Sequence, residues 1–257
     1  MKFIDTHSHL YGRQFHNDMD AVVARAKEVL EHIFLPNVDL ESIDEMHALA
    51  DRDRTFLHPM MGLHPSSVKD DWRTVMDGIE RAWDRGGFVG VGECGLDYYW
   101  DKTHIPQQKE VLRIHIEWAK SMGLPLILHC RDSMDDVIEL VREGQDGRLK
   151  GIFHCFTGTV EHARQVQDLG FVMGIGGVLT YKTSELPEVL KSVPLEALVL
   201  ETDSPYLPPV PHRGKRNESS YIPLVAKRLA EVKEVTLLEV SRVTNATALD
   251  VFGMGES

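Results

Sequence analysis

The sequence contains little of what marks a secreted or membrane-bound protein. Only three of its 257 residues are cysteine, and no two of them form a CxxC pair, so we expect a reducing, cytoplasmic location and no disulfide framework. No apolar run approaches the roughly 20 residues that span a bilayer. The first residues, MKFIDTHSHL, contain no uninterrupted apolar run of the kind that a signal peptide needs. We therefore expect no membrane partner.

Positive charge is also scarce. The chain has 28 Lys and Arg residues against 40 Asp and Glu residues, which gives a net charge of -12 at pH 7. Such a chain is poorly suited to coating nucleic acid without regard to sequence, because that mode of binding needs clustered basic residues. It can still act on an anionic substrate if a metal ion and a local basic loop offset the field. Nothing in the sequence indicates an obligate protein partner.

Short apolar runs alternate with helical patterns along the whole chain. The runs are nearly continuous rather than alternating, which is typical of parallel strands covered by helices on both faces. Eight such units predict an α/β fold, a closed (β/α)8 TIM barrel forming a single domain over residues 1–257, with an open doubly wound sheet as the alternative. A Rossmann GxGxxG fingerprint is missing. The strands are expected at residues 3–9, 32–38, 55–65, 88–97, 124–132, 151–158, 171–177 and 197–207.

Side chains that can bind a metal follow most of these strands at the carboxyl end, where barrel enzymes place their chemistry. They are His7, His9, His64, Glu93, His129, His154 and Asp203. The first two histidines are two residues apart, which puts both rings on one face of a strand. In isolation that pair could equally be two exposed histidines near an N-terminus, and the other members of the set favour metal binding.

Glu93 is a lone carboxylate in a stretch rich in glycine and apolar residues. A buried, unpaired carboxylate costs several kcal/mol, so we expect Glu93 to bind a metal, with a buried ion pair to Arg131 as the alternative. Its two oxygens can bridge two cations. The histidines that end the two following strands, His129 and His154, suggest a second metal beside it.

The last acidic candidates are Asp203 and Glu201, which share one face if the strand continues. We favour Asp203 because it lies nearer the strand end, although an Asp before Ser-Pro is also common in turns. A ligand set of imidazole and carboxylate without thiolate suits Zn, Mn, Fe, Co or Ni, with Mg possible. Cys94, Cys130 and Cys155 each follow a ligand candidate directly and are expected to be buried structural residues.

The chain resembles the TatD-type deoxyribonucleases, a branch of the metal-dependent hydrolase superfamily. The resemblance spans nearly the whole chain, in the segments DTHSHL, MGLHP, VGECGLDYYW, LILHCRD, FHCFTG, GIGGVLTY and LETDSPYL followed by RGKRNE. It implies a barrel with two divalent metal ions (Mg, Mn or Zn). One ion would be held by His7, His9 and Asp203, the other by His129 and His154, and Glu93 would bridge them. It also implies catalytic roles for His64, beside the substrate phosphate, and for Asp203, as the base that positions the attacking water.

The substrate implied by the resemblance is DNA, hydrolysed often from the 3′ end, with single-stranded or frayed DNA ends as the nucleic-acid partner. The loop around Asn217 would contact substrate, although the family motif usually continues with Pro where this chain has Ser219. Four basic residues are expected near the mouth, where they could neutralise phosphates or be ordinary surface charge: Arg131, Arg213, Lys215 and Arg216.

Three consecutive aromatic residues, Tyr98, Tyr99 and Trp100, follow the fourth strand and are expected to stack on an unpaired base. Two other functions fit the same residues. The site could hydrolyse a lactone, a cyclic amide, a phosphotriester or an aminoacyl-tRNA ester, or the chain could be a non-catalytic metal-binding scaffold. Only the nuclease interpretation requires turnover of an oligonucleotide.

Overall fold

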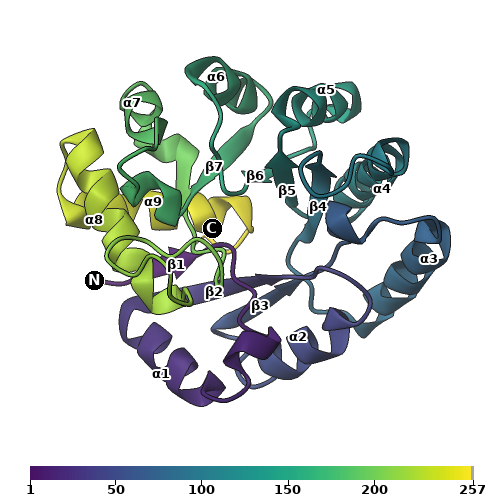
Figure 1. Cartoon of the computed structure of the whole chain (residues 1–257), viewed down its shortest axis with the longest axis horizontal. Helices are drawn as coiled ribbons and strands as arrows, with labels where there is room; N and C mark the ends of the chain where they lie inside the picture. The colour runs from purple at the N-terminus through teal and green to yellow at the C-terminus, as the bar shows by residue number, and fades with distance from the viewer. Residues whose placement is uncertain (256–257) are drawn as a thin grey trace.

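The computed structural model describes residues 1–255 and arranges their eight strands in parallel, with the helices around them (Figure 1). The strands are β1 (Phe3–Asp5), β2 (Leu30–Pro36), β3 (Leu57–Met60), β4 (Val91–Asp97), β5 (Leu126–Arg131), β6 (Gly151–Phe153), β7 (Phe171–Ile175) and β8 (Leu198–Leu200). The α-helices are α1 (Met19–Val29), α2 (Ser42–Ala50), α3 (Trp72–Ala82), α4 (Ile105–Met122), α5 (Met134–Gly144), α6 (Val160–Asp168), α7 (Leu186–Lys191), α8 (Ile222–Lys233) and α9 (Leu237–Val251).

Two seams, β3/β4 and β8/β1, complete the ring of strands. Regular hydrogen bonding joins the strands in two sheets, in the orders β1-β2-β3 and β4-β5-β6-β7-β8. At the β3/β4 seam Met61 forms a parallel bridge with Val91, and at the β8/β1 seam Ser8 forms one with Ser204. The barrel predicted from the sequence is therefore confirmed. Each seam is shorter than a full ladder and consists of one bridge with the backbone hydrogen bonds around it, such as Gly92 N–H to Met61 O and His9 N–H to Ser204 O, both of 2.8 Å.

Several strands end earlier than the sequence predicts, because the chain leaves the sheet as it enters the mouth of the barrel. β6 and β8 end at Phe153 and Leu200, whereas the apolar runs continue to residues 158 and 207. Cys155 and Asp203 have left-handed backbone, with φ of 47° and 54°, which a strand does not contain. α6 begins where the Thr159 side chain accepts the His162 N–H in a capping box.

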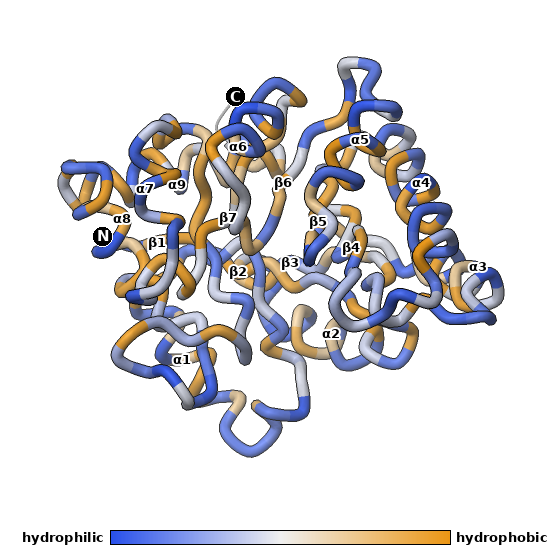
Figure 2. Tube along the Cα trace, turned by 45° about the horizontal axis from the view of Figure 1, so that its top comes forward, coloured by the Kyte–Doolittle hydropathy of each residue, from blue (hydrophilic) through white to orange (hydrophobic). Residues whose placement is uncertain are grey.

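A buried apolar layer closes the amino-terminal end of the barrel. It contains residues from six strands and the end of α9: Ile4, Phe34, Met60, Ile127, Ile152, Val199, Val251 and Phe252. The rings of Phe34 and Phe252 stack with centroids 3.6 Å apart. Figure 2 shows hydrophobic colour along the strands and alternating colours along the helices, as expected where each helix buries one face. The carboxyl ends of the strands are thus left as the open mouth.

Within residues 1–255, every helix is too short or too polar to cross a lipid bilayer.

Candidate metal centre

Glu93 lies at the middle of a cluster of histidines in the mouth. Its Oε2 is 3.0 Å from His7 Nε2 and 3.3 Å from His9 Nε2. Its Oε1 is 2.8 Å from His154 Nε2 and 2.9 Å from His129 Nδ1. The two carboxylate oxygens therefore face two different pairs of imidazole nitrogens. This is the geometry that a carboxylate shared by two cations requires, so the residues present fit a pair of metal ions.

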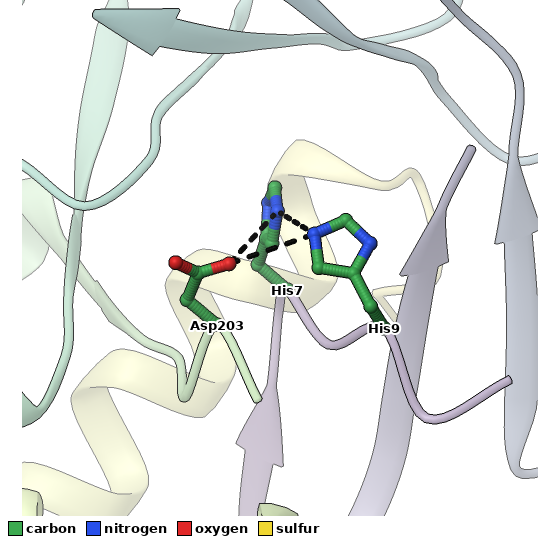
Figure 3. Close-up of side chains that lie close together, drawn as sticks. All are labelled: His7, His9 and Asp203. Atoms are coloured by element: carbon green, nitrogen blue, oxygen red, sulfur yellow. Dashed lines mark hydrogen bonds and ion pairs between the residues drawn. The ribbon is translucent and has the colours of Figure 1, made fainter. Parts of the chain in front are cut away.

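Asp203 completes the group on the Oε2 side. Its Oδ1 lies 3.5 Å from His9 Nε2 and 3.8 Å from His7 Nε2. Figure 3 shows the carboxylate and the two rings turned toward a common point, although they come from opposite ends of the chain. The ligand atoms that the three residues offer lie within 4.8 Å of one another. Sets of imidazole and carboxylate at this separation can hold a first-row divalent cation.

Two glycines let β4 press against β5, so that Glu93 reaches His129. Gly92 and Gly95 have φ of 145° and 143°, which side-chain-bearing residues rarely adopt. A Cβ on Gly95 would lie 2.0 Å from His129 O, and one on Gly92 would lie 2.6 Å from Ile127 O. Both the backbone conformation and the lack of space therefore exclude a side chain at these positions.

Asp5, which the sequence analysis did not single out, fixes the His7 end of the centre. It is buried, and its carboxylate accepts the backbone N–H and the hydroxyl of Thr202 at 2.9 and 2.6 Å and the His7 N–H at 3.3 Å. Burial raises the pKa of Asp5 to about 7, because these hydrogen bonds offset only part of the lost hydration. The signal was present in the DTH segment, where an acid precedes the first histidine by two residues on the same strand face.

Tyr11 determines which nitrogen of His9 faces the centre. The Tyr11 hydroxyl donates to Pro36 O at 2.6 Å and lies 3.0 Å from His9 Nδ1. Because that hydroxyl proton is already used, the oxygen accepts the proton on Nδ1. The lone pair of His9 is then on Nε2, the atom that points at Glu93 and Asp203.

Asp97 does the same for His129 and also holds the loop after β4. Its Oδ2 is 2.9 Å from His129 Nε2, and its Oδ1 accepts the N–H groups of Tyr99 and Trp100 at 2.9 and 2.8 Å. Burial alone would raise the pKa of Asp97, but the hydrogen bonds from His129 and the Trp100 backbone lower it. The ionised carboxylate accepts the Nε2 proton, so His129 presents the lone pair of Nδ1 to Glu93.

His64 has the opposite arrangement. Its Nδ1 accepts the backbone N–H of Ser66 at 3.1 Å, so the proton of the neutral ring is on Nε2. Burial lowers the pKa of His64, which favours this neutral form. Nε2 lies 3.4 Å from Glu93 Oε1 and 3.2 Å from His129 Nδ1. His64 therefore points a hydrogen-bond donor, rather than a lone pair, into the mouth, which distinguishes it from the other four histidines.

Glu201 is the acid that the sequence analysis set aside in favour of Asp203. It is fully buried, its Oε1 accepts the Cys155 N–H at 2.7 Å, and the same oxygen lies 3.5 Å from His154 Nδ1. The ring of His154 stacks on that of His7 with centroids 3.8 Å apart. Glu201 is thus placed behind these rings, on the side away from Glu93, where carboxylates support metal-binding histidines.

The cluster keeps Glu93 ionised. Burial would raise the pKa of Glu93, but His154, His7 and His64 around it lower that pKa well below its ordinary value. Burial also lowers the pKa of His7, with a further contribution from His154, so that its ring is neutral. Burial would also lower the pKa values of His9, His129 and His154, but Tyr11 and the carboxylates around these rings raise all three. In the metal-free centre these rings therefore carry protons that a bound cation would displace.

The centre opens into a cavity of 820 Å³. Residues of β4 and β5 and of the segments after β1, β2, β3, β4 and β8 line it. The lining includes His64, Arg131, Trp100 and Tyr206, together with the acids Asp39, Glu41 and Glu45.

Two expected substrate contacts lie elsewhere. The Tyr98 hydroxyl donates to Asp136 at 2.5 Å, and the ring packs against the core rather than lining the cavity. Asn217 is fully buried, and its amide donates to the carbonyls of Thr202 and Tyr206 at 2.8 and 2.7 Å. The Asn217 amide thus holds the loop after β8 in place and is not available to a substrate.

The basic loop 213–216 also differs from the expectation. Arg216 forms two hydrogen bonds to Asp18, both of 2.7 Å, and its guanidinium lies 4.5 Å from the centre of the Phe15 ring. Arg213 lies 3.9 Å from the centre of the Tyr181 ring, and Lys215 is exposed. These contacts draw the loop away from the cavity, and of the four basic residues expected at the mouth Arg131 alone is among those lining this cavity in residues 1–255.

The three cysteines are free thiols. Cys94 is buried, while Cys130 and Cys155 are half-buried, and burial raises the pKa of all three. They therefore stay protonated, and the burial expected for all three is found only for Cys94.

A parallel barrel whose mouth gathers histidines and carboxylates around a shared acid defines the class of metal-dependent hydrolases. Within that class the chain belongs to the TatD family: the model of the "TatD related DNase" family matches residues 4–253.

Relatives of known sequence carry the same general description. The chain is 39% identical over 251 residues to the uncharacterized metal-dependent hydrolase YabD of Bacillus subtilis, covering 96% of this chain and 98% of that one. It is 32% identical over 263 residues to the uncharacterized metal-dependent hydrolase YcfH of Escherichia coli, covering 100% and 98%.

Solved structures share the fold over almost the full length. The TatD homologue YJJV of Escherichia coli superposes with a TM-score of 0.92 at 28% identity, covering 98% of each chain. A TatD-family hydrolase of Entamoeba histolytica superposes with a TM-score of 0.88 at 24% identity, covering 99% of each chain, and this second likeness concerns the fold alone.

Proposed function

We propose that the protein is a phosphodiester hydrolase that removes nucleotides from DNA ends with two divalent cations. The family description and the relatives' names support a metal-dependent hydrolase. The nuclease activity, the number of cations and the roles of single residues are our proposal. The cysteines of the protein are free thiols, which suits a reducing compartment. We therefore also propose that the protein acts in the cytoplasm.

One observation carries the proposal: the two oxygens of Glu93 face separate histidine pairs, 3.0 and 3.3 Å away on one side and 2.8 and 2.9 Å away on the other. His7, His9 and Asp203 would hold one cation, His129 and His154 the other, and Glu93 both. Two cations so placed activate a water and stabilise the attacking and leaving oxygens of an in-line displacement.

The remaining groups in the mouth fit a phosphate. Burial would raise the pKa of Asp203, but the hydrogen bond with His9 and the charges of His154 and His7 lower it. Asp203 is therefore ionised and can orient a water and take its proton. His64 directs its Nε2 proton into the cavity, where it can donate to a phosphate oxygen. Arg131 lines the same cavity and can pair with a neighbouring phosphate.

The protein part of the mouth is not basic overall. Arg13 and Arg131 are balanced by Asp39, Glu41 and Glu45 along the same cavity. Neutralisation of the phosphate therefore falls mainly to the cations, and metal-free protein should bind an oligonucleotide weakly. This also agrees with the net charge of -12, which disfavours binding to long stretches of nucleic acid.

The test uses protein stripped with EDTA, a labelled single-stranded oligonucleotide, and Mg, Mn or Zn added back. We expect stepwise shortening that requires metal and falls more than about a hundredfold in Glu93→Gln, because this variant removes the shared negative charge and keeps the volume. Glu185→Gln, at an exposed position outside the cavity, is the matched control.

The same panel contains a lactone, a phosphotriester and an aminoacyl-tRNA ester. Turnover of one of these compounds without shortening of DNA would contradict the nuclease activity and assign the metal centre to another class of substrate. Two equivalents of bound metal with no turnover of any substrate would instead indicate a non-catalytic scaffold.

A further inference from the structure

Two large aromatic side chains stand exposed in the wall of the cavity. Trp100 has 68% of its surface accessible and Tyr206 has 54%, and both line the cavity over the centre. Aromatic rings usually bury most of their surface on folding, because that burial is their largest contribution to stability. Two exposed rings in one cavity therefore indicate contact with a ligand that has flat apolar faces.

The two rings belong to loops on opposite sides of Glu93. Tyr206 comes three residues after Asp203, and its ring centroid is 6.4 Å from that of His9, on the Glu93 Oε2 side. Trp100 donates its backbone N–H to Asp97, whose carboxylate holds His129 on the Glu93 Oε1 side.

Both rings are carried by backbone that is held in place. The Tyr206 N–H donates to Asp203 O at 2.9 Å, and its carbonyl accepts the buried amide of Asn217 at 2.7 Å. The Trp100 N–H is bonded to the buried carboxylate of Asp97 at 2.8 Å. Rings presented on fixed backbone lose little freedom on binding, which favours them as docking platforms.

We propose that Trp100 and Tyr206 form two nucleobase subsites, one on each side of the scissile phosphate. The inference rests on the proposed function and deepens it by naming the side chains that hold the two bases beside the scissile phosphate. Each ring stacks on one base, while the phosphate between the two bases lies at Glu93. A base offers its faces in this way only when it is unpaired and unstacked, so a blunt duplex has to fray before it binds. Stacking of this kind tolerates any base sequence.

Arg131 adds a charge to one of the two subsites. Its guanidinium lies 4.0 Å from the centre of the Tyr99 ring and 5.4 Å from that of Trp100. A guanidinium held between an aromatic pair and the cavity can contact the phosphate that follows a base stacked on Trp100. Arg13 also lines the cavity, but within residues 1–255 no guanidinium or ammonium group is stacked on the Tyr206 ring, so the two subsites are unequal.

The experiment measures steady-state kinetics of the metal-loaded enzyme on a single-stranded oligonucleotide. Trp100→Ala and Tyr206→Ala should each raise KM about tenfold and change kcat by less than about threefold, because a stacked base contributes to binding rather than to the displacement. Trp100→Phe and Tyr206→Phe should recover most of the loss. Leu238→Ala, at a position that is 67% exposed on α9 and outside the cavity, is the control for removing surface apolar area.

Oligonucleotides with a single abasic nucleotide assign each ring to a base. Loss of the terminal base should cancel the effect of one alanine variant, and loss of the penultimate base should cancel the effect of the other. Affinity for a phosphorothioate-ended oligonucleotide, measured by fluorescence anisotropy, should follow the same pattern without turnover.

Cleavage by the parent enzyme with KM unchanged in both alanine variants would overturn the subsites and leave the nuclease function intact. Equal effects of each variant on normal and abasic strands would also overturn them. Failure of the parent enzyme to shorten any oligonucleotide would instead overturn the proposed function, and the subsites with it.

Discussion

Replacing Asp97 with Asn should remove one metal site while leaving the loop after β4 unchanged. Oδ1 of the carboxylate accepts two backbone N–H groups, those of Tyr99 and Trp100, and Oδ2 faces His129 Nε2 at 2.9 Å. An Asn side chain has to keep its oxygen against the two N–H groups, because its NH2 group would meet two donors there. The NH2 group is then directed at His129.

This orientation reverses the tautomer of His129. The amide of Asn donates to Nε2, so the ring proton moves to Nδ1, which lies 2.9 Å from Glu93 Oε1. The lone pair that would bind a cation is lost, and the new N–H bonds to Glu93 instead. A hydrogen bond to a charged group contributes about 1.5–3 kcal/mol. We therefore expect the affinity for one of two metal equivalents to fall about 10- to 100-fold.

The assay is competition between the protein and a chelator for Zn or Mn, with the metal content measured by mass spectrometry. The near-ultraviolet circular dichroism of the tryptophans reports on the loop and should match the parent. Asp101→Asn is a close control: Asp101 also accepts two loop N–H groups, at 2.8 and 3.1 Å, but its other oxygen pairs with Lys69 and with His104, a histidine outside the metal centre.

The reasoning would be refuted by an Asp97→Asn protein that binds two equivalents with parental affinity. An Asp101→Asn protein with an equal loss of affinity would refute it as well, since the effect would then belong to the loop and not to the tautomer.

Two further predictions concern stability. Asp5 has a pKa of about 7 in the folded protein against 3.8 as its ordinary value, so its contribution to stability is complete below about pH 4 and is lost as the pH rises to about 7, by up to about 4 kcal/mol. In urea unfolding of metal-free protein, the free energy of unfolding of Asp5→Asn minus that of the parent should therefore increase across this window. A difference that stays constant with pH would contradict the assignment. Gly95→Ala should lower the free energy of unfolding by more than about 3 kcal/mol and weaken metal binding, because its Cβ would lie 2.0 Å from the backbone oxygen of His129 and its φ is 143°. Gly253→Ala, which has a φ of 66° and open space around its Cβ, should cost only about 1–2 kcal/mol and leave metal binding unchanged.

The sequence predicted the barrel because its evidence is local and repeated. Each strand is an apolar run, and the helices carry their own apolar pattern, with a side-chain cap at α6 and α9, where Thr159 and Thr236 accept a backbone N–H. The strand ends were placed too late at β6 and β8 because apolar residues also continue into the mouth, where left-handed residues such as Cys155 and Asp203 turn the chain. Hydrophobicity alone does not reveal these turns.

The sequence also pointed to Glu93 and to the six residues that the structure gathers around it, since parallel strands bring their carboxyl ends together. It could not show their hydrogen bonds. The role of Asp97 depends on which nitrogen of His129 it faces, and the role of Asn217 on two carbonyls that it reaches across the loop after β8. Residue type is compatible with either a substrate contact or a structural bond at such positions.

The metal centre lies across one of the two seams of the barrel, the one between β8 and β1. β1 belongs to the three-stranded sheet and β8 to the five-stranded one, and the bridge between Ser8 and Ser204 joins them at the mouth. A cation held by His7, His9 and Asp203 would cross this same seam and tie the first strand to the end of the last. Force applied to the amino-terminal end of the chain would then act on the bonds to that ion as well as on the backbone. In a single-molecule pulling experiment, the force needed to peel β1 away should rise when the metal is present.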